Sequence, residues 1–183
     1  MTDLAALEKR IRRIEDLEEI KNLRARLARG ADDDHNLVTI MPLFHDDASI
    51  EYIHPTMADR FGAHHGKEAI RKYLAGVPDN IMTWSLHYWV SPLIEFDESD
   101  ENKATGSWYY WGAYNMRNPV TKELEGQNAG AVFYDEYIRQ DGKWLFRKFS
   151  VQLETFARID PSGALYPVIQ EQNDQPGKPS TSS

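Results

Sequence analysis

The chain contains no cysteine, which excludes disulfide bonds, thiolate metal sites and a cysteine nucleophile. It also lacks any apolar run near the ~20 residues that a membrane-spanning helix needs. Its start, MTDLAALEKR, is charged and predicts no export signal. Acidic residues outnumber basic ones to give a formal net charge of −8, so the basic footprint of a nucleic-acid-binding protein is missing. These absences favour a cytoplasmic protein that binds neither nucleic acid nor a membrane.

The chain does contain enough apolar sequence for one sizeable core. Its 183 residues, 41% of them hydrophobic, correspond to a single domain. We assign this domain to residues 1–160 and predict a C-terminal extension over 161–183. The end of that extension, QEQNDQPGKPSTSS (170–183), has the composition of a disordered tail.

The first third of the chain is predicted to be mainly helical. Leucine and isoleucine recur at spacings of three and four between Leu4 and Leu27, which predicts an amphipathic helix over 3–31, as one bent helix or two in tandem. The segment GADDDHN (30–36) then breaks the pattern with a glycine and turn-forming residues. Shorter elements follow: a helix at 36–45, a strand at 48–54, a loop at 55–66 and a helix at 67–77.

Beyond residue 80 the apolar pattern changes to a period of two, which predicts β-strands. Four strands are expected, near 82–97, 103–116, 127–140 and 143–157. Helices followed by an antiparallel meander define an α+β fold. We predict a cone-shaped α+β barrel, in which a curved mixed or antiparallel sheet wraps round the N-terminal helices.

Several segments together resemble a known family. They are IKNLRARLARGADD (20–33), LFHDDASIEY (43–52), LHYWVSPLIEFDESDENKATGSWYYWGAY (86–114) and YDEYIRQDGKW (134–144). Their order and separations, over roughly residues 5–157, resemble the SnoaL-like branch of the nuclear transport factor two superfamily. This resemblance implies the cone-shaped fold. Relatives include dehydratases, a dehydrochlorinase, an isomerase, polyketide cyclases and a lignin-derived diarylpropane lyase, so the resemblance does not select a reaction.

The resemblance also implies a catalytic dyad. In the dehydrochlorinase and bile acid dehydratase of the family, an aspartate near the end of the first helix pairs with a histidine on the first long strand, and Asp32 and His87 fall at these positions. Leu27 stands where those relatives have a polar or aromatic catalytic helper, and Phe149 where the dehydrochlorinase has a catalytic arginine. The residues alone favour a core histidine at His87 and a turn residue at Asp32, and the resemblance reverses this preference in favour of the dyad. The run DDD (32–34) leaves the register open by one residue.

The chemistry of such a pair is general acid–base catalysis. Histidine is the side chain whose ordinary pKa lies closest to neutral pH, and a carboxylate on one ring nitrogen fixes its tautomer. Aromatic residues that share strand faces with His87, or lie on neighbouring strands, predict a cavity for a hydrophobic, aromatic small molecule, with tyrosine hydroxyls as donors to an oxyanion or leaving group. The predicted substrate-binding residues are Tyr52, His54, Trp89, Trp108, Tyr110, Tyr114, Phe133 and Phe149. The alternative is that these aromatic residues form a plain core.

Aromatic residues also occupy the opposite strand faces, at Tyr88, Tyr109 and Trp111. A sheet with one face in water should alternate apolar and polar residues, so the outer face is predicted to contact another subunit. The family resemblance implies a dimer or trimer, and we expect a homotrimer, with a homodimer as the alternative.

No metal or coenzyme is predicted. The segment HPTMADRFGAHH (54–65) holds three histidines without a recognised ligand spacing, and the chain has no nucleotide-binding glycine loop. His35 and His45 are expected at the surface or at a helix cap.

The function predicted from these features is that of a cofactor-independent lyase. His87, oriented by Asp32, would remove a proton, after which water leaves (dehydration) or formaldehyde leaves (a retro-aldol step, as in diarylpropane breakdown). The alternatives are an isomerase or cyclase, and a non-catalytic small-molecule-binding or assembly module of the same fold.

Overall fold

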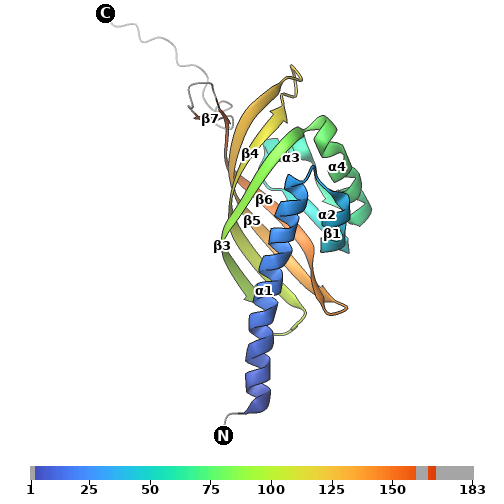
Figure 1. Cartoon of the computed structure of the whole chain (residues 1–183), viewed down its shortest axis with the longest axis vertical. Helices are drawn as coiled ribbons and strands as arrows, with labels where there is room; N and C mark the ends of the chain where they lie inside the picture. Colours follow the sequence, from blue (N-terminus) through green and yellow to red (C-terminus); the bar gives the residue numbers. More distant parts are fainter. Residues whose placement is uncertain (1–2, 160–164, 168–183) are drawn as a thin grey trace, which may run out of the picture.

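The computed structural model describes residues 3–159 and 165–167 (Figure 1). The predicted disordered tail at 170–183 lies outside the described residues. The elements are α1 (Leu4–Asp32), α2 (Leu37–Ile40), the 3-10 helix η1 (Met41–Leu43), β1 (Phe44–Tyr52), α3 (Pro55–Phe61), β2 (His64–His65), α4 (Lys67–Asn80), β3 (Met82–Phe96), β4 (Lys103–Arg117), β5 (Leu124–Gln140), β6 (Lys143–Ile159) and β7 (Leu165–Pro167).

The strands form one mixed, curved sheet in the order β2-β1-β6-β5-β4-β3, with β7 on β6. Every pairing is antiparallel except that of β1 with β6. The predicted α+β cone, with its sheet curved round the N-terminal helices, is confirmed. The four predicted long strands are present, and register shifts next to Gly130 and between Val90 and Leu93 mark bulges that bend the sheet.

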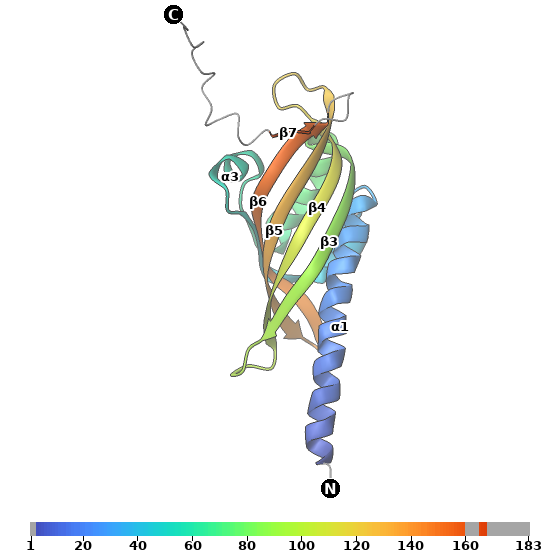
Figure 2. The ribbon, with the colours of Figure 1, turned by 90° about the vertical axis from the view of Figure 1, so that its left-hand side faces the viewer.

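Helix α1 is a single continuous helix that begins after Asp3, whose side chain accepts a hydrogen bond from the backbone of Ala5. Its first turns project beyond the sheet (Figures 1 and 2), so the apolar residues Leu4, Ile11 and Ile14 are exposed. The apolar face of α1 packs on the sheet only beyond these residues. Every helix in the described part of the chain is too short or too polar to span a membrane.

Two predicted segments differ from the structure. The helix predicted at 36–45 ends at Leu43 as α2 and η1, because Phe44 already pairs with β6. The loop predicted at 55–66 contains helix α3 and the short strand β2. The sequence does carry a signal for α3, since Pro55 occupies the first helical turn and Gly62 follows the last residue.

The helices lie on the concave side of the sheet, as Figure 1 shows, and Figure 2 shows the outer face of β3–β6 with no helix over it. Tyr88, Tyr109 and Trp111 on this outer face are 53%, 63% and 42% exposed in the single chain. The subunit contact expected there stays a prediction.

Buried polar contacts attach α1 to the sheet. The Arg24 guanidinium pairs with Asp135 on β5, and both side chains are almost completely buried. Tyr137 also donates to Asp135, and Trp108 donates to the Tyr137 hydroxyl at 2.9 Å. Buried polar groups are stable only when they are hydrogen-bonded, so this network fixes where α1 lies on the sheet.

Candidate active site

Asp32 and His87 meet where the end of α1 crosses β3. The His87 Nδ1 lies 2.6 Å from one carboxylate oxygen of Asp32, and the other oxygen accepts a hydrogen bond from the His87 backbone N–H at 3.3 Å. Next to this pair, the Ser85 hydroxyl donates to the carbonyl of Ala31 at 3.2 Å. These contacts fix both the helix end and the carboxylate. They also resolve the register of the three aspartates, because Asp33 and Asp34 are exposed.

The dyad has a defined tautomer. A carboxylate accepts hydrogen bonds only, so the Nδ1 of a neutral His87 carries the proton and donates it to Asp32. The Nε2 atom then carries no proton, and its lone pair is free to accept one. The His87 side chain is 12% exposed and that of Asp32 is 23% exposed, so both are largely removed from bulk water. Such a ring can act as a general base on whatever lies against its Nε2.

His87 forms part of the wall of an internal cavity of about 140 Å³. Asp32 does not line this cavity and lies in a crevice between α1 and β3, which His87 borders as well. The ring of His87 therefore separates the carboxylate from the cavity. Apart from a few hydroxyl and imidazole groups, the cavity wall is apolar, as a site for a hydrophobic ligand requires.

Most of the residues that the sequence predicts as substrate-binding line this cavity, namely Tyr52, Trp89, Tyr110, Tyr114, Phe133 and Phe149. Two others do not. Trp108 shares the inner face of β4 but lies nearer the other end of the strand, where its indole bonds to Tyr137. His54 follows the end of β1 as the N-cap residue of α3 and is absent from the lining.

The cavity also contains residues that the sequence analysis did not assign to a site. His35 was expected at the surface or at a cap, but it lines the cavity with its ring centroid 6.5 Å from that of His87. Burial, together with the nearby His87, lowers the pKa of His35 to about 4, so its imidazole is neutral at physiological pH. Tyr73 of α4 also reaches the cavity. The only signal for Tyr73 in the sequence was its place on the inward face of a short amphipathic helix.

Tyr110 and Tyr114 on β4 face His87, each with a ring centroid 5.7 Å from the imidazole. Their hydroxyls form a short hydrogen bond with each other. Burial raises the pKa of both hydroxyls, so both stay protonated and available as donors. Gly112 lies between them, directly opposite His87 in the β3–β4 register, and a Cβ at this position would collide with both hydroxyls.

The Trp89 ring stacks on His87, with 5.2 Å between centroids and 8° between planes. Trp89 also contacts Arg24, whose guanidinium lies 5.0 Å from the Trp89 ring centroid. A cation over an indole ring is an attractive contact that is stronger when water is excluded. The stack therefore links the buried Arg24–Asp135 network to the orientation of the His87 imidazole.

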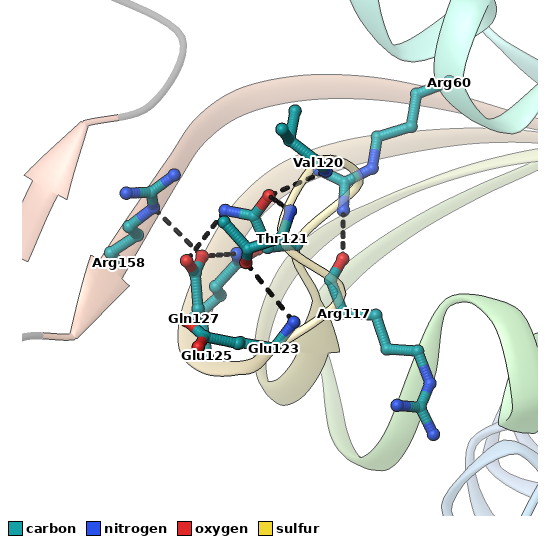
Figure 3. A network of polar contacts seen from close by, with 9 residues as sticks. Arg60, Arg117, Val120, Thr121, Glu123, Glu125, Gln127 and Arg158 are labelled. Atoms are coloured by element: carbon teal, nitrogen blue, oxygen red, sulfur yellow. Dashed lines mark hydrogen bonds and ion pairs between the residues drawn. The ribbon is translucent and has the colours of Figure 1, made fainter.

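Helix α3 contributes one residue to the cavity wall. Phe61 lines the cavity and packs on Tyr52 with 5.0 Å between ring centroids. The Arg60 guanidinium reaches the carbonyl of Arg117, at the end of β4, at 3.4 Å (Figure 3). Near the start of β5, Glu125 pairs with Arg158 of β6 at 3.1 Å. The Arg60 contact connects α3 to the end of β4.

The histidines of the 54–65 segment do not gather round a common point. His64 stacks on Tyr73, with 4.0 Å between ring centroids, and bonds through its Nε2 to the carbonyl of Phe61. Nowhere in residues 3–159 and 165–167 do three potential metal ligands come together.

Comparisons with known proteins agree on the fold. The family model described as SnoaL-like domain matches residues 12–150. A hexachlorocyclohexane dehydrochlorinase (LinA) Type2 structure is 21% identical with a TM-score of 0.69, over 81% of this chain and 92% of that chain. A candidate scytalone dehydratase from Novosphingobium aromaticivorans is 18% identical with a TM-score of 0.66, over 85% and 95%. A candidate aromatic ring hydroxylase from the same organism is 16% identical with a TM-score of 0.66, over 86% and 96%.

These structural neighbours carry the names of different reactions, and at such identities the likeness establishes the fold alone. No curated protein sequence matches the chain.

Proposed function

The chain belongs to the SnoaL-like domain family, and we propose that it acts there as a cofactor-independent lyase on a hydrophobic, aromatic small molecule. One observation carries this proposal: the Asp32–His87 hydrogen bond leaves Nε2 as the basic atom at the wall of a mostly apolar cavity. A base in such a site is not masked by hydration, and the fixed carboxylate stabilises the imidazolium that forms when Nε2 takes a proton.

In the proposed dehydration, Nε2 of His87 removes a proton from a carbon next to an activating carbonyl or aryl group. The C–H electron pair becomes the new C=C bond, and the C–O bond on the neighbouring carbon breaks. The Tyr110–Tyr114 pair donates to the departing oxygen, which leaves as water. The substrate loses one hydrogen and one hydroxyl group, and the imidazolium proton restores the tyrosine pair.

A retro-aldol variant uses the same groups on a substrate with a hydroxymethyl side chain. Here Nε2 takes the hydroxyl proton, the C–C bond breaks, and the O–H oxygen becomes the carbonyl of formaldehyde. The electron pair of the broken bond remains on the substrate carbon, which is protonated in turn. The dyad serves both reactions, because each begins with proton removal by one base.

The names of two structural neighbours support elimination chemistry. A dehydrochlorinase and a dehydratase both remove a proton and a leaving group from adjacent atoms. Phe149 lies in the cavity wall of this chain, so an arginine side chain to bind a departing chloride is missing at that position. We therefore propose an oxygen leaving group rather than chloride. Assembly into a homotrimer, in the cytoplasm, remains part of the proposal.

The test is a substrate screen. Purified protein is incubated with β-hydroxy ketones that carry one apolar ring, some of them with hydroxymethyl groups, and the products are followed by mass spectrometry with a formaldehyde assay. Loss of the mass of one water from any member is the expected result, and formaldehyde release would assign the retro-aldol variant. The matched controls are His65→Ala and Asp34→Asn, which change exposed residues outside the cavity.

Ligands that bind in the cavity but keep both their mass and their isomeric form would contradict the lyase. That outcome would favour a non-catalytic binding module, whereas a change of isomer without a change of mass would favour an isomerase or cyclase.

A further inference from the structure

We propose that the cavity has a second polar anchor, formed by Tyr52 and Tyr73, and that its substrate is a single-ring molecule with two acceptor oxygens. One oxygen binds at the Tyr110–Tyr114 pair beside His87, and the other binds at the Tyr52–Tyr73 pair. This inference rests on the proposed function in one respect only, which is that the substrate occupies this cavity.

The Tyr52 and Tyr73 hydroxyls lie 3.1 Å apart, at hydrogen-bond distance. Both residues line the cavity. Burial raises the pKa of both hydroxyls, so neither ionises at physiological pH. Tyr73 is held in place by the stacked His64 ring, whose own Nε2 is bonded to the backbone of Phe61. The anchor is therefore a preformed site supported by a second layer of contacts.

A hydrogen-bond count of the two tyrosine pairs gives the number of acceptors that a ligand needs there. Trp89, another cavity residue, has a buried indole N–H without a partner and is a further donor. Each tyrosine pair contains two hydroxyl hydrogens, and one of them is used within the pair. Among the described residues, no other partner is found for any of these four hydroxyls. One donor in each pair is thus left over, and buried donors without a partner cost about 1–3 kcal/mol each. A ligand with one acceptor oxygen at each pair would satisfy both.

The two pairs approach the cavity from different sides. Tyr110 and Tyr114 belong to β4, whereas Tyr52 belongs to β1, and β6 and β5 separate these strands in the sheet. That is three strand spacings, or about 14 Å measured along the curved sheet. The side chains extend into the cavity from both sides and leave a shorter gap. The two acceptor oxygens therefore belong at different positions of the ligand and not on one group.

The size of the cavity limits the body of the ligand. Its volume is about 140 Å³. An engineered apolar cavity of about 150 Å³ in another protein binds benzene. The space therefore fits one six-membered ring with small substituents and favours a single-ring ligand over the two aryl rings of a diarylpropane. Among the aromatic small molecules predicted from the sequence, single-ring compounds are thus the proposed substrates.

The experiment measures binding alone, so it is independent of turnover. Cyclohexanone, cyclohexane-1,4-dione and 2,2-dimethylcyclohexane-1,3-dione are titrated calorimetrically into the wild type and into two double variants, Tyr52→Phe/Tyr73→Phe and Tyr110→Phe/Tyr114→Phe. The two diones share a six-membered ring with cyclohexanone and add a second acceptor at different spacings. A fourth ligand, 4-phenylcyclohexanone, adds a second ring.

At least one dione is expected to bind the wild type about 2- to 12-fold more tightly than cyclohexanone, the factor that one further hydrogen bond provides. Either double variant should remove that advantage, whereas a single replacement would leave one hydroxyl free to donate. Cyclohexanone, which can use the remaining pair, should lose about 2-fold or less, the statistical factor for one of two equivalent sites. The two-ring ketone should bind more weakly than cyclohexanone.

Equal affinity of both diones and cyclohexanone for the wild type would overturn the second anchor, as would a dione advantage that survives Tyr52→Phe/Tyr73→Phe. Tighter binding of the two-ring ketone would overturn the single-ring limit. A dione advantage without turnover of any substrate in the screen would contradict the proposed lyase and leave the anchor standing, so the two failures are distinguishable.

Discussion

Replacement of His87 by alanine is expected to lower kcat/KM by about 10²- to 10⁴-fold, the usual contribution of a general base. The variant retains the cavity but has no atom able to accept the substrate proton. His87→Gln should be equally inactive, because its amide nitrogen is a donor and not a base. The measurement is steady-state kinetics on a substrate found in the screen, with His65→Ala as the matched histidine control.

Replacement of the Asp32 carboxylate should also lower the activity. Asp32→Asn can donate its amide N–H to Nδ1, which would favour the tautomer with the proton on Nε2 and so remove the base from the cavity. We expect a loss in kcat of similar order, with Asp34→Asn unchanged. Activity that persists in both His87→Ala and Asp32→Asn would exclude the dyad from the mechanism.

Replacement of Arg24 by methionine should cost about 3–5 kcal/mol of unfolding free energy, because it leaves the buried Asp135 carboxylate without a counter-charge. Burial lowers the pKa of Arg24 to about 10, so the wild-type guanidinium is still charged at neutral pH. Urea denaturation at constant pH measures this loss as a lower midpoint with an unchanged slope.

A double variant supplies the control for Arg24→Met. Combining it with Asp135→Leu removes both buried charges, and most of the lost stability should return, since apolar replacements of whole buried pairs are often neutral. Recovery distinguishes an uncompensated charge from a simple packing defect. If Arg24→Met instead costs under about 1 kcal/mol, the typical value for an exposed pair, then the pair is not buried in solution.

The fold could be predicted from the sequence because the period of the apolar residues identifies its main helix and its long strands. The spacing of leucines and isoleucines from Leu4 to Leu27 identifies α1, and the change to a period of two after residue 80 identifies β3 to β6. Helix α3 was missed although Pro55 and Gly62 mark its ends. Its seven residues are too few for an apolar period to stand out from a loop.

The candidate site was less accessible, because its contacts join residues that are distant in the chain. Asp32 and His87 were paired through the family resemblance, whereas local patterns alone favoured a core histidine. Arg24 lies on the inner face of α1 among Ile20, Leu23 and Leu27, which marks it as unusual, but its partner is 111 residues away. No local pattern specifies such a pairing.

The residues that line the cavity could also be predicted only in part from local patterns. Alternation along β3 and β4 correctly placed Trp89, Tyr110 and Tyr114 on the inward face. The alternation also placed Trp108 on the inward face, which is correct, but Trp108 does not line the cavity. Its ring instead packs near Arg24 and its indole bonds to Tyr137, and alternation along a strand does not predict these contacts. The position of His35 depends on the turn after α1, where its backbone has a positive φ of 53°.

The central claim is that His87 faces the cavity with an unprotonated Nε2 because Asp32 holds the proton on Nδ1. A two-bond proton–nitrogen correlation spectrum of isotope-labelled protein tests it most directly, at a pH where the ring is neutral. His87 is identified among the six histidines by its absence from the spectrum of His87→Gln. We predict a protonated Nδ1 and an unprotonated Nε2 in the wild type, and a loss of this preference in Asp32→Asn. A wild-type ring that carries its proton on Nε2 would contradict the account.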